Sequence, residues 1–299
     1  DHPVAIQFGS ANLLEFQSTQ TNFATMLFDP EVMYAIINEN YVPGSNDPPP
    51  ATYGGDELNF VRELDLTTLE YSEEIYAAGQ DGNLTVEYPN NNLGEQLAVT
   101  AKLISGGLMT PIYRLHIGGF DTHAGQSNDH SQRLNQTSNA ISAFLQDLKN
   151  QGLNDRVMVM TTSEFGRRVG ENGSNGTDHG TSGPIFTFGT TTIGDVYGSQ
   201  PSLSNLDNNN NLLVEHDFRQ VYSTLIKTGL EWIHPFHNLF FRIHLIQFRL
   251  WQIRYRSMVR LLFRTPLLFS LRFLIRLIRR LIFVLNYPLK QGQLYGSLT

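Results

Sequence analysis

The stretch DLKNQGLNDRVMVMTTSEFG, residues 147–166, carries the pattern that decides the fold of this chain. Its first residues complete a helix predicted over 129–150, in which apolar side chains recur at helical spacing. Residues 156–161, RVMVMT, form a short and nearly continuous apolar run, which is typical of a strand buried on both faces. Ser163 to Gly166 end that run with polar residues and a glycine. A helix, a buried strand and a polar loop in this order indicate an α/β protein.

The same unit recurs on both sides of this stretch. Further strands are predicted over residues 4–8, 111–117 and 184–188, and further helices over 56–79, 94–105 and 217–230. The inward face of the helix over 129–150 is predicted to carry Leu134, Ile141, Phe144, Leu145 and Leu148. Strands that alternate with helices favour a parallel sheet with helices on both faces. We therefore predict an α/β fold with a doubly wound, mostly parallel sheet flanked by helices.

Charge divides the chain into two parts. All 28 acidic residues lie within residues 1–232, together with 10 of the 21 lysines and arginines, so that segment has a net charge of 10 − 28 = −18. Residues 233–299 hold the other 11 basic residues and no acid. We predict one α/β domain over 1–232 and a separate arginine-rich tail over 233–299. The acidic domain argues against non-specific binding of nucleic acid.

The tail has two alternative interpretations. Arginines spaced by multiples of four, such as Arg256, Arg260 and Arg264, suit a basic amphipathic helix on an anionic membrane surface. They interrupt every apolar run, so a transmembrane span is not predicted. The other interpretation is a segment read out of frame, because acids are absent and arginine outnumbers lysine ten to one there. At the other end, the sequence begins with DHPVAIQFGS, inside a predicted strand and without Met, and we expect an N-terminally truncated domain.

Three polar clusters lie beside the predicted strands. They are GGFDTHAGQSNDH at 118–130, TSEFGRR at 162–168 and GTDHG at 176–180. Ligands in open parallel sheets bind beyond the carboxyl ends of the strands, where these clusters are expected to meet. The carboxylates and imidazoles suit a divalent metal ion, and the predicted ligands are Asp121, His123, Glu164, Asp178 and His179. The predicted substrate-binding residues are Arg167, which could hold an anion in two hydrogen bonds, and His130.

Each of these residues also has a purely structural interpretation. Asp121 and Asp178 could each hydrogen-bond the backbone of their own turn. Glu164 could pair with Arg167, and His130 could be a histidine of the first helical turn with no ligand. The chain has no cysteine, which excludes thiolate metal sites and a cysteine nucleophile. It also has no phosphate-binding P-loop, no GxGxxG, no HExxH and no GxSxG motif.

The segments around the clusters resemble a known bacterial family. GGFDTHAGQ, the long segment from DLKNQGLNDRVMVM to GTDHGTSGPIFTFG, and DFRQVYSTLIK look like the family catalogued as domain of unknown function 1501. The resemblance covers about residues 1–228. That family is similar to the alkaline-phosphatase and sulfatase superfamily. The resemblance implies an alkaline-phosphatase-like α/β fold, divalent metal ions and hydrolysis of phosphate or sulfate esters.

The resemblance also assigns roles to individual residues. It implies that Asp121, His123 and His179 are metal ligands. At the position where the superfamily has Asp-His, this chain has Glu164 and Phe165, so one imidazole is lost and Asp178 is expected to replace part of its role. The superfamily's nucleophile lies upstream of the matched region, so none is expected within this chain.

The resemblance and the clusters lead to one main function and two alternatives. The main hypothesis is an exported, periplasmic or secreted hydrolase of small anionic esters that uses zinc or manganese. One alternative is a non-catalytic binding or scaffold protein on the same fold. The other, which depends on the tail alone, is a protein that contacts membranes.

Overall fold

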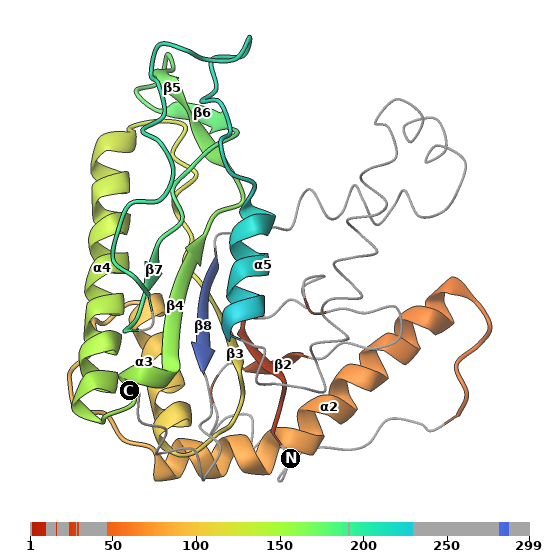
Figure 1. The fold of residues 1–299 in the computed structure, drawn as a ribbon. Coiled ribbons are helices and arrows are strands. Elements are labelled where there is room, and N and C mark those ends of the chain that lie inside the picture. The colour runs from red at the N-terminus through yellow and green to blue at the C-terminus, as the bar shows by residue number, and fades with distance from the viewer. Residues whose placement is uncertain are drawn as a thin grey trace. The chain divides into compact units, whose positions relative to one another are not determined.

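The computed structural model of the chain describes residues 2–9, 16, 24–27, 29, 47–190, 192–229 and 281–286 (Figure 1). The chain divides into two compact units. One comprises Asp1–Leu213 with Arg279–Thr299, and the other comprises Val214–Ile278. The described residues of the first unit form the sheet and three α-helices. In the second, the described element is helix α5, Phe218–Gly229.

The sheet of the first unit has six strands in the order β2-β1-β3-β8-β4-β7. Their bounds are β1 Ala5–Phe8, β2 Ala24–Leu27, β3 Ile112–His116, β4 Val157–Thr162, β7 Thr187–Phe188 and β8 Leu281–Asn286. β1 pairs in parallel with both β2 and β3. β8 lies between β3 and β4 and is antiparallel to both. The fold is therefore mixed α/β, with a parallel three-stranded part on one side of β8.

The expectation of a mostly parallel sheet is thus correct for β1, β2 and β3 and wrong for β7 and β8. The predicted strand over 184–188 shortens to β7, which runs antiparallel to β4. It returns beside β4 after a hairpin and without a crossover helix, and a parallel connection needs such a crossover. Helices on both faces of the sheet, as in a doubly wound fold, stay a prediction.

Strand β4 confirms the central prediction. Val157 to Met160 are all buried, as expected for a strand covered on both faces. The buried core around it joins β1, β3 and the helices, and its largest members include Tyr113, Phe144 and Leu97. The four apolar residues of RVMVMT are thus all buried, and Val157 and Val159 belong to this core.

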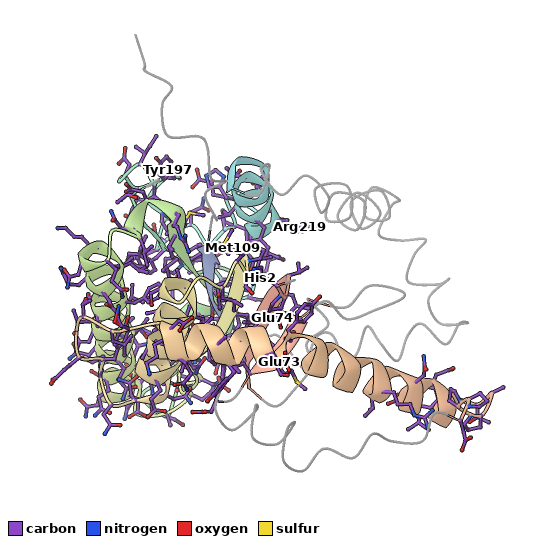
Figure 2. The ribbon with its side chains drawn as sticks, turned by 90° about the horizontal axis from the view of Figure 1, so that it is seen from below. His2, Glu73, Glu74, Met109, Tyr197 and Arg219 are labelled. Carbon is purple, nitrogen blue, oxygen red and sulfur yellow. The ribbon has the colours of Figure 1, made fainter. Side chains whose placement is uncertain are left out.

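The helices of the first unit are α2 Tyr53–Asp81, α3 Asn92–Ser105 and α4 Gln126–Asn150, with a 3₁₀ helix, η3, at Asn154–Arg156. Thr52 caps α2, and Asn91 caps α3. Each side chain accepts one hydrogen bond from the backbone N–H of the residue three positions later, as polar N-cap residues do. α3 packs against β3, and both α2 and α4 pack against α3. In α2, Ser72, Ile75 and Ala78 are buried, while Glu73 lies exposed on the polar face (Figure 2).

The predicted inward face of α4 is correct only over its second half. Ile141, Phe144 and Leu148 are buried, whereas 49% of the Leu134 surface is exposed. The helix has 25 residues and β4 has 6. At 1.5 Å per helical residue and 3.3 Å per strand residue, α4 is about 37 Å long and β4 about 20 Å. The first half of α4 therefore extends past the strand.

A separate two-stranded sheet follows β4, where the sequence predicted only loops. It is the antiparallel pair of β5, Gly166–Glu171, and β6, Thr177–Gly180. Two of the three predicted clusters lie on it. In the part of the chain that the structure describes, no helix is both long and apolar enough to cross a lipid bilayer.

The predicted boundary between a domain over 1–232 and a tail over 233–299 stays a prediction. Residues 230–280 and 287–299 lie outside the described residues, and so does any helix in the tail. Of the predicted tail, 233–299, the structure describes β8, which belongs to the six-stranded sheet.

Candidate metal centre

The β5–β6 hairpin positions the third cluster. Arg167 on β5 pairs with His179 on β6, which places both side chains at the same level of the ladder. Asn172 organises the turn between the strands, because its Oδ1 accepts hydrogen bonds from the backbone N–H groups of Ser174 and Gly176. A polar side chain that satisfies two turn amides fixes a short connection.

The segment that carries Asp121 and His123 lies against this hairpin. The backbone N–H groups of Gly125 and Gln126 donate to the carbonyls of Ser174 and Asn175, and the Asn172 side-chain amide donates to the carbonyl of His123. Gly176 makes the approach possible, since a Cβ there would lie 2.3 Å from the carbonyl carbon and oxygen of His123. Two segments about 55 residues apart in sequence thus become neighbours.

Three side chains converge where the segments meet. Asp121 Oδ1 lies 2.6 Å from His179 Nε2 and 3.1 Å from His123 Nε2. The two Nε2 atoms are 3.1 Å apart. Asp121, His123 and His179 form a group whose potential ligand atoms all lie within 4.8 Å of one another, and all three residues are exposed. The sequence prediction brought these three residues together, and the structure places them side by side.

Asp178, which the sequence predicts to be a direct metal ligand, lies outside the group of converging ligand atoms. Its Oδ1 lies 3.4 Å from His123 Nδ1, on the opposite side of the imidazole from the Nε2 that faces the cluster. A carboxylate at Nδ1 favours the tautomer with its proton on Nδ1, which leaves the lone pair of Nε2 for a metal ion. Asn172 and Arg168 also contact this carboxylate, at 3.3 and 3.9 Å. The hydrogen bond from Asn172 is the main cause that lowers the pKa of Asp178.

Arg167 closes the other side of the cluster. Its guanidinium donates to the carbonyls of Phe120 and Thr177 and lies 3.5 Å from Asp121 Oδ1. Its side chain is largely buried, and this burial lowers the pKa of the guanidinium. The hydrogen bond from His179 lowers the pKa of Asp121, and the charges of His179, His123 and Arg167 act in the same direction. The carboxylate is therefore held in its ionised form.

Phe165 covers one face of His179. The two rings stack with centroids 3.6 Å apart and an interplanar angle of 15°. The Arg167 guanidinium carbon also lies 5.1 Å from the centre of the Phe165 ring. An apolar ring thus fixes the orientation of a polar one, at the position where the resemblance leads one to expect an imidazole.

The remaining predicted residues lie outside the group of converging ligand atoms. Glu164 is half-buried next to Phe165 and is not a member of that group. His130 is the fifth residue of α4. Its ring and the ring of Phe120 pack edge to face, with their centroids 5.7 Å apart. It therefore supports the segment before Asp121. Both predicted roles, metal ligand for Glu164 and substrate binding for His130, stay predictions.

The converging side chains are of the types that bind a metal ion, and their ligand atoms lie closer together than those around a bound ion. Zinc bound at about 2.0–2.1 Å in a tetrahedron has ligand atoms roughly 3.3 Å apart. The observed separations of 2.6 to 3.1 Å are slightly shorter than that spacing. One carboxylate and two imidazoles are ligands that zinc, manganese and iron all accept. A small outward movement of the three side chains would therefore admit an ion.

Sequence reasoning missed Asn172. It contacts the His123 carbonyl, the Asp178 carboxylate and two amides of its own turn. Asparagine in a segment rich in glycine and serine, ENGSNG at 171–176, is common in any turn. The sequence signal therefore identified a turn and could not identify a residue that joins two ligand segments.

Comparison with known proteins gives one match. No curated protein and no solved structure shows significant similarity to the chain. A family model described as "Protein of unknown function (DUF1501)" matches residues 70–231, which include the whole cluster and the hairpin. That match covers more than half of the 299 residues, and the chain belongs to the DUF1501 family of proteins of unknown function.

Proposed function

We propose that this protein binds a divalent metal ion, zinc or manganese, and hydrolyses small phosphate or sulfate esters. The observation that supports the proposal is the convergence of Asp121, His123 and His179 beside the Arg167 guanidinium. A cationic group next to a metal site suits an anionic substrate. The resemblance to the alkaline-phosphatase and sulfatase superfamily supports the same reaction class and an exported location, periplasmic or secreted.

The residues would share the work as follows. Asp121, His123 and His179 would hold the ion, and Asp178 would orient the imidazole of His123. Arg167 would orient the anionic group of the substrate. The bound ion would polarise the ester and neutralise charge that develops on it. The proposal assigns no nucleophile within the chain and no nucleic-acid partner.

Metal titration tests the proposal. We expect zinc or manganese to bind the full chain, and Asp121→Asn or His179→Ala to lower the affinity at least 10-fold, because each variant removes one ligand. Matched controls are Asp195→Asn and His216→Ala, which change exposed residues of the same types outside the cluster. Equal affinity of the wild type and both cluster variants, measured by calorimetry, would refute the proposed site.

A second candidate function is a non-catalytic exported binding or scaffold protein on the same fold. The stacked Phe165 ring supports it, because phenylalanine stands at the position where the superfamily has the histidine of its Asp-His pair. The two candidates predict different results with generic aryl phosphate and aryl sulfate esters. Turnover that His179→Ala abolishes would exclude the binding-protein function.

Membrane contact through the arginine-rich tail is a separate hypothesis. It concerns residues 233–299, of which the structure describes only β8. Binding of the full chain to anionic vesicles at low salt, compared with a full-length variant in which Arg256, Arg260 and Arg264 are changed to glutamine, tests it. Equal binding by both chains would exclude a role for these arginines.

A further inference from the structure

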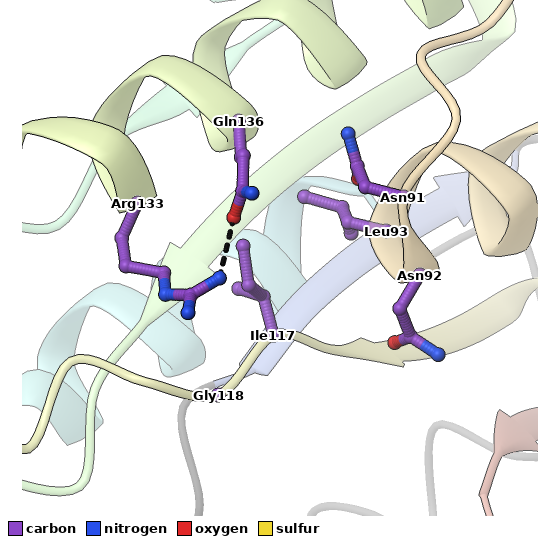
Figure 3. Close-up of a pocket in the computed structure, with 7 residues that line it drawn as sticks. All are labelled: Asn91, Asn92, Leu93, Ile117, Gly118, Arg133 and Gln136. Atoms are coloured by element: carbon purple, nitrogen blue, oxygen red, sulfur yellow. Dashed lines mark hydrogen bonds between the residues drawn. The ribbon is translucent and has the colours of Figure 1, made fainter. Parts of the chain in front are cut away.

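A pocket lies at the carboxyl end of β3, and none of the cluster residues Asp121, His123 and His179 lines it. Its volume is about 310 Å³, and it opens between the first turn of α3, the residues after β3, and α4 (Figure 3). Arg133 and Gln136 extend from α4 towards Ile117, and Asn91 and Leu93 face them from the start of α3 (Figure 3). Gly118 and Asn92 complete the lining.

The pocket wall is fixed by hydrogen bonds between its elements. The side chain of Gln96, the fifth residue of α3, accepts from the backbone N–H of His116 and donates to its carbonyl. This pair ties the start of α3 to the end of β3. On α4, Arg133 Nη1 donates to Gln136 Oε1 at 2.7 Å, which orients the guanidinium relative to the helix. Hydrogen bonds therefore hold both the backbone elements and the Arg133 side chain of the pocket wall in place.

The charges and donors of the lining point to an anionic ligand. Arg133 is the one charged residue among those that line the pocket. Its Nε is buried and has no hydrogen-bond acceptor among the described residues. Asn92 and Leu93 lie at the first positions of α3, where backbone N–H groups have no partner within the helix and the helix dipole is positive. Glu95 is the acid in that turn, and it is exposed and does not line the pocket.

Gly119 adds a close backbone contact to the arginine. A Cβ at this position would lie 2.4 Å from Arg133 Nε, and its φ of +82° suits glycine. The backbone of the loop after β3 therefore packs directly on the guanidinium. Gly118 precedes Asp121 by three residues, so their Cα atoms are at most about 11 Å apart. The loop after β3 therefore connects the pocket lining to the segment that carries Asp121.

We propose that this pocket binds an oxyanionic group, such as a phosphate, sulfate or carboxylate, carried on a small organic molecule. The guanidinium and the first amides of α3 recognise the anion, and the side chains of Leu93 and Ile117 contact the organic part. A volume of about 310 Å³ lies at the lower end of the range for small-molecule sites, roughly 300–1,000 Å³, and is more than a single inorganic anion needs. Binding here does not require a metal ion.

Calorimetry of the full chain, freed of metal ions on a chelating resin, tests this pocket separately from the metal cluster. The probes are glucose 6-phosphate, inorganic phosphate and glucose. We expect saturable binding of glucose 6-phosphate, weaker binding of inorganic phosphate and none of glucose. Tighter binding of the inorganic ion would show that a free anion is the ligand and would overturn the part of the proposal that concerns the organic body. Absence of saturable binding of both phosphates would overturn the whole.

Two variants locate the binding. Gln136→Glu places a carboxylate beside Arg133 and should lower the affinity for glucose 6-phosphate at least 10-fold, because the new acid competes for the guanidinium. Gln146→Glu makes the same change at an exposed position of α4 outside the pocket and should leave the affinity unchanged. Equal affinities of the two variants would overturn the proposal. Arg133→Lys provides a second measurement, since it keeps the charge but removes the paired Nη donors of the guanidinium, and the affinity should fall as well.

Discussion

The carboxylate of Asp178 contacts a residue of the cluster but does not belong to the cluster itself. It lies on the Nδ1 side of His123, and Asn172 and Arg168 hold it there. Its neighbour His179 points into the cluster, because successive residues of a strand point to opposite faces. The adjacent pair Asp178-His179 therefore splits into an outer carboxylate and an inner imidazole.

This geometry predicts the effect of Asp178→Asn. All three residues of the cluster remain, but the imidazole of His123 loses its charged partner. We expect the affinity for zinc to fall by about 10–100-fold, as is usual when such an outer partner is changed. Metal titration of the variant, beside the exposed control Asp195→Asn, measures this. An affinity equal to that of the wild type would mean that Asp178 plays no part in orienting His123.

A second residue prediction concerns Asp147, which is fully buried on α4. Its carboxylate accepts hydrogen bonds from the backbone N–H and hydroxyl of Thr85 and from the hydroxyl of Tyr88. Burial, and then this hydrogen bond, raises the pKa of Tyr88, so the phenol stays a donor. Asp147 thus fixes the segment between α2 and α3 to α4.

Asp147→Ala would remove the buried acceptor of three hydrogen bonds, two from Thr85 and one from Tyr88. We expect the free energy of unfolding to fall by about 2–4 kcal/mol, since a hydrogen bond to a charged group contributes roughly 1.5–3 kcal/mol. Chemical denaturation followed by circular dichroism measures the change. Asp155→Ala, at an exposed acid near the end of the same helix, is the control and should change stability little. Equal losses in both variants would contradict the role given to Asp147.

At the scale of elements, the site depends on how the β5–β6 hairpin meets the segment before α4. The contact consists largely of backbone atoms, with the amides of Gly125 and Gln126 bonded to the hairpin turn. Gly176 lies at the closest approach. Asp121 and His123 lie on the segment before α4, and His179 lies on the hairpin. Separation of the two segments would therefore disrupt the cluster even with all three side chains unchanged.

Gly176→Ala tests this dependence. The added methyl would lie 2.3 Å from the His123 backbone, so one of the two segments has to move. We expect a loss of about 1–3 kcal/mol in stability, the usual cost of overpacking, together with weaker metal binding. Gly173→Ala, in the same turn but with open space around its Cβ position, is the control and should keep both properties. Retained metal affinity in Gly176→Ala would show that the approach of the two segments is not required.

At the scale of the whole molecule, β8 is the element that completes the sheet. It pairs with all five residues of β3 and all six of β4, and no other described strand joins these two. The parallel part of the sheet on one side and the strand that leads to the hairpin on the other therefore depend on a segment close to the C-terminus.

A proline in β8 should disrupt this connection. Proline at Val284 removes an N–H group and cannot fit the ladder of a central strand, whereas alanine keeps the backbone bonds. We expect Val284→Pro to lower the melting temperature strongly and Val284→Ala to lower it less. Differential scanning calorimetry of both variants measures this. Equal melting temperatures would mean that residues 281–286 do not form the central strand.

The sequence alone determined the local elements of this protein. The apolar run at 156–161 predicted β4, and helical spacing predicted α3 and the second half of α4. These signals are local, since burial on both faces or on one face repeats with the period of the element itself. The residue types around positions 121, 123 and 179 likewise predicted metal chemistry, because carboxylates and imidazoles carry that information wherever they lie.

Only the tertiary structure decided how these parts meet. The antiparallel direction of β7 and β8, the β5–β6 hairpin and the place of Asp178 behind His123 all depend on pairings between distant residues. Such pairings leave no period in the sequence, and the apolar run 281–285 follows several other short apolar runs in the tail without a signal for its partners. The same holds for the pocket at Arg133, which exists because α3, β3 and α4 pack at one point. Local periodicity fixes what each segment becomes, and the packing of the whole chain fixes which side chains face one another.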